Sequence, residues 1–205
     1  MMNRIITLCI GWCLLNPSYA NALPDYKSKP DQHVKALLKK YGKSRVNHTL
    51  IVDISAQKMH LYRANRRLKT YTVSTSKFGI GSRSGSQKTP LGIHRIQKKF
   101  GSGAKRGTIF KARRNTGKVA RIITDTQSSK ADYVTTRIMW LQGLQKGINR
   151  GYKIDSFKRY IYIHGTDEEG RLGKPASHGC VRMYNDDVIE LFSQVPVGTL
   201  VNIIR

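Results

Sequence analysis

The sequence predicts a mostly β domain with a few short helices, and three observations support this prediction. From Thr49 onward the chain is divided into short runs rich in Val, Ile, Thr and Tyr, residue types that are enriched in strands. Gly, Ser and Pro, which favour turns, separate these runs. Strand-like and helix-like segments do not alternate, as they would in an α/β protein. The 205 residues suffice for one domain with its own core.

The beginning of the chain is predicted to be a removable leader. Residues 1–22 start with a short polar stretch containing Arg4, continue with an apolar run over 5–15 and end in small residues, which is the pattern of a signal peptide. The apolar run is shorter than the ~20 residues that a membrane-spanning helix needs. We therefore expect an exported, soluble protein.

Residues 23–47 are predicted to form an N-terminal extension with a short helix over 31–41, and residues 48–205 the domain itself. The strand pattern assigns 49–54, 58–63, 69–76, 92–96, 120–124, 136–141, 159–164 and 200–204. Residues 97–120 contain several glycines and little periodicity, so they are predicted to be a long loop or lid.

Two later segments place residues with chemical potential. In the strand predicted at 159–164, the two-residue period puts Tyr160, Tyr162 and His164 on one face. A helix is predicted to begin at Asn185, with that residue as its N-cap.

The charge of the chain is strongly positive. Lys and Arg number 37 against 12 Asp and Glu, a formal net charge of +25. Such a charge predicts salt-sensitive association with polyanions. Because the protein is expected to be exported, we expect anionic envelope components and no nucleic acid. The segment 95–121 holds ten Lys or Arg and no acid. It is interpreted either as a solvated loop or as a surface that captures substrate or anchors the protein.

The strongest chemical signal is the run Ser177-His178-Gly179-Cys180-Val181-Arg182, which follows Ile163-His164-Gly165-Thr166 after a short spacer. Cys9 and Cys13 lie in the predicted leader, so Cys180 is expected to be the only cysteine of the mature protein. A thiol without a disulfide partner and with two histidines nearby in sequence indicates a nucleophile.

The neighbouring residues suggest how this thiol is activated. His164 ends a strand, which is a rigid mount for a general base, and the carbonyl of Gly165 is placed to orient its imidazole. Gly179 permits a substrate carbonyl to approach closely. The backbone amides of residues 178–180 are expected to converge on a developing oxyanion, each donor contributing roughly 2.7–4 kcal/mol. The expected reaction is acyl transfer through a thioester.

Three further residues receive supporting roles. Ser177 is predicted to form hydrogen bonds within the loop, and Arg182 to support the loop or to bind a carboxylate. Tyr162 is predicted to shape the substrate groove, although aromatic residues on strands also serve as core.

Other interpretations of Cys180 remain open from the sequence. Free cysteines are often buried packing residues. Cys180 with His164 and His178 is also a conceivable zinc set, although zinc ligands usually have tighter or paired spacings. The strong charge also fits a module that binds the envelope and catalyses nothing.

These motifs resemble the signature of the L,D-transpeptidase (YkuD) catalytic domain. The resemblance includes Thr89-Pro90-Leu91-Gly92, residues 136–141 and residues 159–164, and it covers about residues 48–205. These segments resemble the single-domain periplasmic members of Gram-negative bacteria, so the resemblance implies a periplasmic location. It also implies a β-sandwich catalytic domain with a lid loop beside the groove.

The resemblance implies a peptidoglycan stem tetrapeptide as donor. Cys180 would attack the carbonyl of the L-centre of diaminopimelate and release D-Ala, while His164, oriented by the Gly165 carbonyl, takes the thiol proton. The acceptor would be a second diaminopimelate amine, a lipoprotein lysine, a D-amino acid or water. No metal or other cofactor is implied, and carbapenems are expected to acylate the same sulfur.

Several alternatives remain. With water as acceptor, the protein would be an L,D-carboxypeptidase or a hydrolase that releases a wall-linked lipoprotein. A basic envelope-binding protein with a vestigial site is the alternative from another class. The side chain of His178 either contacts substrate or holds the loop. The acids at 167–169 either attract the acceptor ammonium or form a solvated turn.

Overall fold

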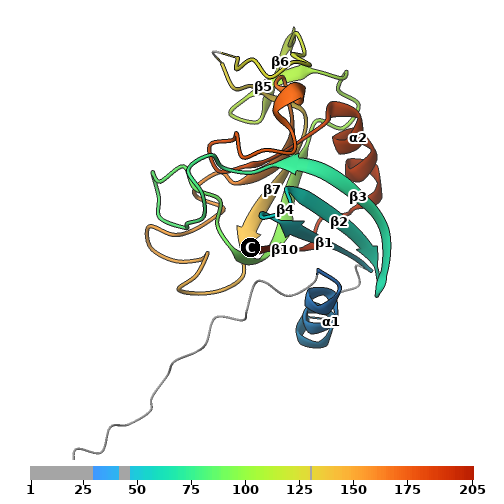
Figure 1. Ribbon diagram of the computed structural model, residues 1–205, viewed down its shortest axis with the longest axis vertical. Coiled ribbons are helices and arrows are strands. Elements are labelled where there is room, and N and C mark those ends of the chain that lie inside the picture. The colour runs from blue at the N-terminus through green and yellow to red at the C-terminus, as the bar shows by residue number, and fades with distance from the viewer. Residues whose placement is uncertain (1–29, 42–46, 130) are drawn as a thin grey trace, which may run out of the picture.

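The computed structural model describes residues 30–41, 47–129 and 131–205 (Figure 1). The predicted leader, with Cys9 and Cys13, lies outside the described residues, as do 23–29 and 42–46. The strands are β1 (His48–Asp53), β2 (Lys58–Arg63), β3 (Arg66–Ser74), β4 (Gly92–Phe100), β5 (Thr108–Lys111), β6 (Arg114–Val119), β7 (Val134–Gly143), β8 (Tyr162–Thr166), β9 (Val181–Met183) and β10 (Leu200–Ile204). The helices are α1 (Pro30–Tyr41), the 3-10 helix η1 (Glu169–Arg171) and α2 (Asn185–Gln194).

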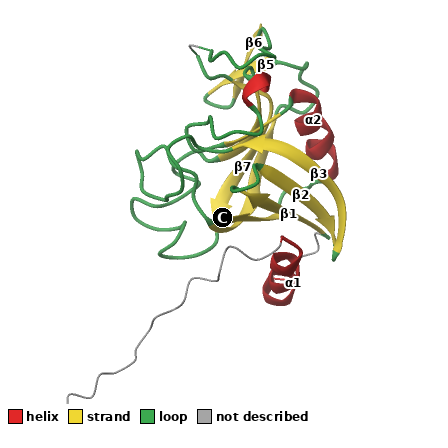
Figure 2. Cartoon of the chain, viewed as in Figure 1, coloured by secondary structure: helices red, strands yellow, loops and turns green. Residues whose placement is uncertain are grey.

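The prediction of a mostly β fold is confirmed (Figure 2). The strands form one sheet in the order β4-β10-β1-β2-β3-β9-β8-β7-β5-β6, and β4 also pairs with β7. Since β4 is bonded to β10 on one side and to β7 on the other, the sheet closes on itself. The hairpin β5–β6 continues from β7 outside this ring. The two layers expected of a sandwich are thus parts of one continuous sheet.

The core lies inside the ring. Alternate residues of the strands face inward and form one apolar cluster, to which α2 contributes Val188 and Leu191. On the opposite face of β1, Ile51 packs against Val34 and Leu37 of α1. Helix α1 therefore covers this part of the sheet from outside (Figure 1). Within the described residues, no helix is long and apolar enough to cross a bilayer.

The segment predicted to be a loop at 97–120 contains strands. β4 continues to Phe100, and the hairpin β5–β6 follows it. Every residue of β6 is exposed, so its sequence carries no alternation of apolar and polar residues that could have revealed it. The strand predicted at 120–124 is wrong. The chain there is held by hydrogen bonds from the Ile123 amide to the Asp167 carbonyl (2.7 Å) and from the Gly170 amide to the Ile123 carbonyl (3.0 Å).

The strand predicted to start at residue 159 starts at Tyr162. Tyr160 has a φ of 58°, and its amide donates to the carbonyl of Phe157 (3.1 Å), so the chain is still turning there. Tyr160 therefore does not share a strand face with Tyr162 and His164, and its side chain is half exposed.

The prediction of Asn185 as a helix cap is also wrong, because Tyr184 occupies the N-cap position of α2. The side chain of Asn185 is buried and ties strand ends together. Its Oδ1 accepts from the hydroxyls of Thr135 (2.7 Å) and Thr136, and its Nδ2 donates to the carbonyl of Thr166 (2.8 Å). These hydrogen bonds hold β7 and β8 in place next to the candidate site.

Candidate functional site

Cys180 directly precedes β9, beside the strand that carries His164. β8 and β9 run parallel with Ile163 opposite Val181, and both of these side chains belong to the core. Because side chains alternate along a strand, His164 and Arg182 face the other side of the sheet, as does Cys180. The fold therefore brings the predicted nucleophile and base to one face of two neighbouring strands.

The sulfur of Cys180 lies between two backbone groups. The amide of Tyr162 donates to Sγ, and the thiol donates to the carbonyl of Tyr160, both at 3.4 Å. Burial raises the pKa of the thiol to about 11, although the charges of Arg182 and Arg159 act to lower it. The resting thiol is therefore protonated at neutral pH and requires a base to become nucleophilic.

His164 has the properties of such a base. Its Nδ1 donates to the carbonyl of Gly165 at 2.6 Å, so the contact predicted from the sequence is present. Burial lowers the pKa of the imidazole to about 4, which keeps the ring neutral at physiological pH. Since Nδ1 carries the proton, Nε2 carries the lone pair, and no hydrogen bond to Nε2 is formed by the described residues.

The two groups are near neighbours without a direct hydrogen bond. His164 lies opposite Arg182, two residues beyond Cys180, so Cys180 and His164 are diagonal neighbours on adjacent strands. Strands lie about 4.8 Å apart and two residues span about 6.6 Å along a strand, so these two positions are about 8 Å apart, a separation that two facing side chains can span. In the described residues, the thiol donates to Tyr160 rather than to His164.

The loop before Cys180 is fixed by Ser177, in agreement with the predicted role of this hydroxyl. Its Oγ donates to the carbonyl of Cys180 (2.6 Å) and accepts from the amide of Gly179 (3.2 Å). Gly179 has a φ of 120°, and a Cβ there would lie 3.3 Å from the carbonyl of Lys88, so only glycine fits without strain. Because the Gly179 amide is engaged, it is not available as an oxyanion donor, contrary to expectation. The amides of His178 and Cys180 remain candidates.

Arg182 supports this loop through a carboxylate that the sequence analysis missed. Arg182 is 1% exposed, and its guanidinium donates to Glu168 (2.6 Å) and to Asp132 (2.5 Å). The other oxygen of Asp132 accepts from Nδ1 of His178 (2.5 Å). Burial acts to raise the pKa of Asp132, but the charge of Arg182 and the hydrogen bond from His178 outweigh it, and the pKa is lowered. Asp132 thereby links Arg182 to His178.

His178 is held by its side chain. In addition to the bond with Asp132, its ring lies 5.8 Å from the ring of Phe78. These contacts match the interpretation in which His178 holds the loop. Among the described residues, no group of three or more His, Cys, Asp or Glu side chains is placed to hold a metal ion.

The acids at 167–169 are not a solvated turn. Asp167, Glu168 and Glu169 are 2%, 1% and 8% exposed. Glu168 is ion-paired with Arg182 and Glu169 with Arg106, so neither is free to attract an acceptor ammonium. Of the three, Asp167 alone forms no ion pair with a described residue.

The hairpin β5–β6 places the guanidinium of Arg113 over aromatic rings near the Cys180 sulfur. Ala112 and Arg113 form its turn, with φ values of 50° and 68°. The Cζ atom of Arg113 lies 4.7 Å from the ring centroid of Trp140 and 5.1 Å from that of Tyr160. Its Nη1 donates to the hydroxyl of Tyr162 (3.2 Å). Tyr162, which the sequence analysis predicts to shape the groove, thus has a hydrogen-bond partner that the sequence did not indicate.

The basic segment 95–121 does not act as one uniform surface. Lys99 donates to the carbonyls of Phe192 (2.6 Å) and Val195 (2.7 Å) at the end of α2, where a cation suits the helix dipole. Arg106 is ion-paired, as described above, and Arg113 lies in the site. Part of the charge therefore stabilises the fold.

Comparison with known proteins identifies related sequences. The family model described as the L,D-transpeptidase catalytic domain (YkuD) matches residues 47–203. A protein of Bacillus subtilis (strain 168) named as an L,D-transpeptidase, YkuD, is 40% identical over 42% of this chain and 50% of its own length. A protein of Escherichia coli (strain K12) named as an L,D-transpeptidase, YbiS, is 50% identical over 22% of this chain and 15% of its own length. The matched part thus spans half or less of these curated relatives.

Comparison with solved structures gives matches at low identity. L,D-transpeptidase 3 from Mycobacterium tuberculosis, in complex with a faropenem-derived adduct, is 14% identical, with a TM-score of 0.49. The match covers 78% of this chain and 61% of that one.

Proposed function

Because the chain belongs to the L,D-transpeptidase catalytic domain family, we propose that it is an exported cysteine acyltransferase that acts on peptidoglycan stem tetrapeptides in the periplasm. One observation carries the proposal. Cys180 shares a sheet face with a buried, neutral imidazole whose tautomer is fixed by the carbonyl of Gly165.

The first step forms the thioester. Rotation of the Cys180 side chain between staggered rotamers turns Sγ from the Tyr160 carbonyl toward Nε2 of His164. Catalytic hydrogen bonds are often long before substrate binds, so the resting geometry is compatible with this step. As Nε2 takes the proton, sulfur attacks the carbonyl carbon at the L-centre of diaminopimelate. The raised thiol pKa favours proton transfer in step with formation of the carbon–sulfur bond.

Attack on the carbonyl carbon gives a tetrahedral intermediate with an oxyanion, and this intermediate then breaks down to the acyl-enzyme. The amides of His178 and Cys180 donate to the oxyanion, and His164 returns its proton to the nitrogen of D-Ala, which leaves as the free amino acid. In the second half, an acceptor amine loses a proton to His164 and attacks the thioester carbonyl, and the sulfur departs and is reprotonated. Proton transfer by His164 accounts for both halves, and the scheme uses no metal or organic cofactor.

The identity of the acceptor is tested by incubating purified protein with sacculi and weighing the muropeptides after digestion. We expect 3→3 crosslinked dimers together with free D-Ala, and none of either with Cys180→Ala. Shortened monomers without dimers would instead assign a hydrolase. Addition of a wall lipoprotein or a D-amino acid distinguishes the remaining amine acceptors.

The non-enzymatic alternative is tested on the same sulfur. A protein with a vestigial site gains no mass from a carbapenem, whereas we expect one covalent adduct on the wild type and none on Cys180→Ala. Binding of Cys180→Ala to sacculi over a salt series separately measures anchoring by the basic surface, which is expected to weaken as salt increases.

A further inference from the structure

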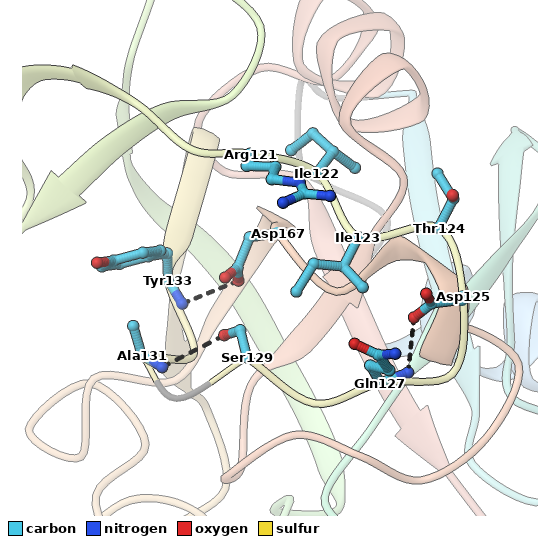
Figure 3. Close-up of a pocket in the computed structure, with 10 residues that line it drawn as sticks. All are labelled: Arg121, Ile122, Ile123, Thr124, Asp125, Gln127, Ser129, Ala131, Tyr133 and Asp167. Carbon is cyan, nitrogen blue, oxygen red and sulfur yellow. Dashed lines mark hydrogen bonds between the residues drawn. The ribbon is translucent and has the colours of Figure 1, made fainter.

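A cavity of about 420 Å³ lies next to the segment that leads into β7 (Figure 3). It is formed mainly by the segment between β6 and β7, together with the first residue after β8. Its lining consists of Arg121, Ile122, Ile123, Thr124, Asp125, Gln127, Ser129, Ala131, Tyr133 and Asp167. The sequence analysis considered two of them, Asp167 among the acids at 167–169 and Arg121 in the basic segment 95–121, but did not predict that they share a cavity.

One wall of the cavity carries a buried carboxylate. Asp167 is 2% exposed, and its Oδ1 accepts from the amide of Tyr133 at 3.0 Å. No Lys or Arg of the described residues lies within ion-pair distance of it. Burial raises its pKa, and the hydrogen bonds from Ser129 and from the Tyr133 amide offset this shift only in part. A carboxylate in this environment gains from a cationic ligand, because the ligand restores the interactions that burial removed.

The other features of the cavity limit what that ligand is. Ile122, Ile123 and Tyr133 provide apolar surface for an aliphatic chain. Arg121 lies at the rim, and Figure 3 shows its side chain directed toward the cavity. Arg121 forms no ion pair within the described residues, so its guanidinium is available for a carboxylate. An aliphatic chain that carries both an ammonium and a carboxylate satisfies all three features.

The segment 131–133 lies between the cavity and residues that flank Cys180. Ala131 and Tyr133 line the cavity, whereas Asp132 between them points the other way, to His178 and Arg182. The inference requires that a substrate at Cys180 extends one side chain past this segment into the cavity.

We propose that this cavity binds the free amino-acid end of the donor's diaminopimelate residue, with the ammonium at Asp167 and the carboxylate at Arg121. The inference rests on the proposed function, because it concerns the substrate of the same site. The acceptor is the poorer occupant. Its amine is the nucleophile and must reach the thioester, whereas Asp167 follows His164 by three residues, about 10 Å of extended chain.

The test compares three synthetic stem tetrapeptides that differ only at the third residue: meso-diaminopimelate, lysine, and diaminopimelate amidated at its free carboxylate. D-Ala release is measured for each. We expect the wild type to favour meso-diaminopimelate over the other two by about tenfold in kcat/KM, the factor that corresponds to one charge-assisted contact of roughly 1.4 kcal/mol. Arg121→Gln should bring this ratio close to one, and Asp167→Asn should slow release from all three peptides.

The matched control is Arg114→Gln, an exposed arginine of β6 that does not line the cavity, and it should keep the wild-type ratio. Carbapenem acylation of Cys180 reports folding and the nucleophile independently of diaminopimelate. Equal release from all three peptides by the wild type, or an unchanged ratio in Arg121→Gln, overturns the inference while the proposed function stands. Absence of both D-Ala release and acylation in the wild type overturns both.

Discussion

Two regions of the molecule each contain a histidine that is no more than 2% exposed, and the contrast between them shows what makes an imidazole available for chemistry. His94 in β4 and His164 in β8 are 0% and 2% exposed, and burial lowers the pKa of each to about 4. Each also has Nδ1 beside a backbone carbonyl, that of Gly92 (2.9 Å) or Gly165 (2.6 Å). By pKa and burial alone, the two sites are equivalent.

They differ at the second ring nitrogen. Nε2 of His94 lies 3.0 Å from the hydroxyl of Ser156, so both nitrogens are satisfied within the fold. Nε2 of His164 has no such partner among the described residues and shares a sheet face with Cys180. A perturbed pKa therefore marks burial at both positions, and the open nitrogen marks the candidate base.

The largest effect is expected at the open nitrogen. His164→Asn keeps a donor that can bond to the Gly165 carbonyl but removes the acceptor at Nε2. Carbapenem acylation, followed by intact-protein mass spectrometry, should slow by about 10²–10⁴-fold, the usual contribution of a general base. A rate within a few-fold of wild type would show that His164 is as structural as His94.

His94→Asn is the matched variant, with the same substitution in the closed region. It leaves a buried partner unsatisfied, which costs roughly 1–3 kcal/mol of stability. A domain of this size loses about 2–4 °C in thermal midpoint per kcal/mol. We therefore expect a lower midpoint but an acylation rate per folded molecule close to wild type. A loss of rate comparable to that of His164→Asn would erase the distinction.

The shared pKa predicts a shared acid response. Both imidazoles titrate near 6.5 when unfolded and near 4 when folded, so the unfolded state binds more protons between these values. The stability from the two neutral rings is complete above pH 6.5 and is lost as the pH falls through about 4. Each ring contributes a slope of about 1.4 kcal/mol per pH unit within that window.

Urea unfolding of the wild type and both single variants over this pH range measures that slope. Each single variant should remove the contribution of one ring to the pH dependence of the unfolding free energy, and the double variant should remove both contributions. The acylation profile should respond differently: His94→Asn should retain the wild-type decline of rate near pH 4, which reports protonation of His164. A profile shifted by His94→Asn would couple two sites that the structure separates.

The parts of this comparison that the sequence could predict are local ones. The strand carrying His164, the adjacent Gly165 and the loop around Cys180 lie in continuous motifs, so residue type and spacing were informative. Asp132, which bonds to an arginine 50 residues away, depends on how the loop before β7 folds back. His94 likewise has its partner Ser156 62 residues away.

The errors have the same origin. Asn185 has the right residue type for a helix cap, but tertiary contacts with the ends of β7 and β8 use its side chain instead. The hairpin β5–β6 was missed because β6 is exposed on both faces, which removes the alternation on which strand prediction depends. Arg113 at its tip was one of many basic residues, and only its position over Trp140 distinguishes it.

The smallest effect concerns how each histidine region is closed. Around His94, closure is permanent because Ser156 is part of the fold, whereas the site near Cys180 is covered by the tip of β5–β6. Arg113 holds that tip through contacts with Trp140 and the Tyr162 hydroxyl. A cation–π contact at a partly exposed position contributes about 0.5–1 kcal/mol. Arg113→Gln should therefore accelerate amide hydrogen exchange in the hairpin by roughly 2–5-fold.

Exchange in β4 around His94 should not change in this variant, since that strand belongs to the closed ring. Arg114→Gln, one residue further along and without these contacts, should leave the hairpin as in the wild type. If both variants exchange at the wild-type rate, the hairpin is held by its own strand pairing and by β7. The hairpin would then cover the nucleophile as permanently as the Ser156 hydroxyl occupies Nε2 of His94.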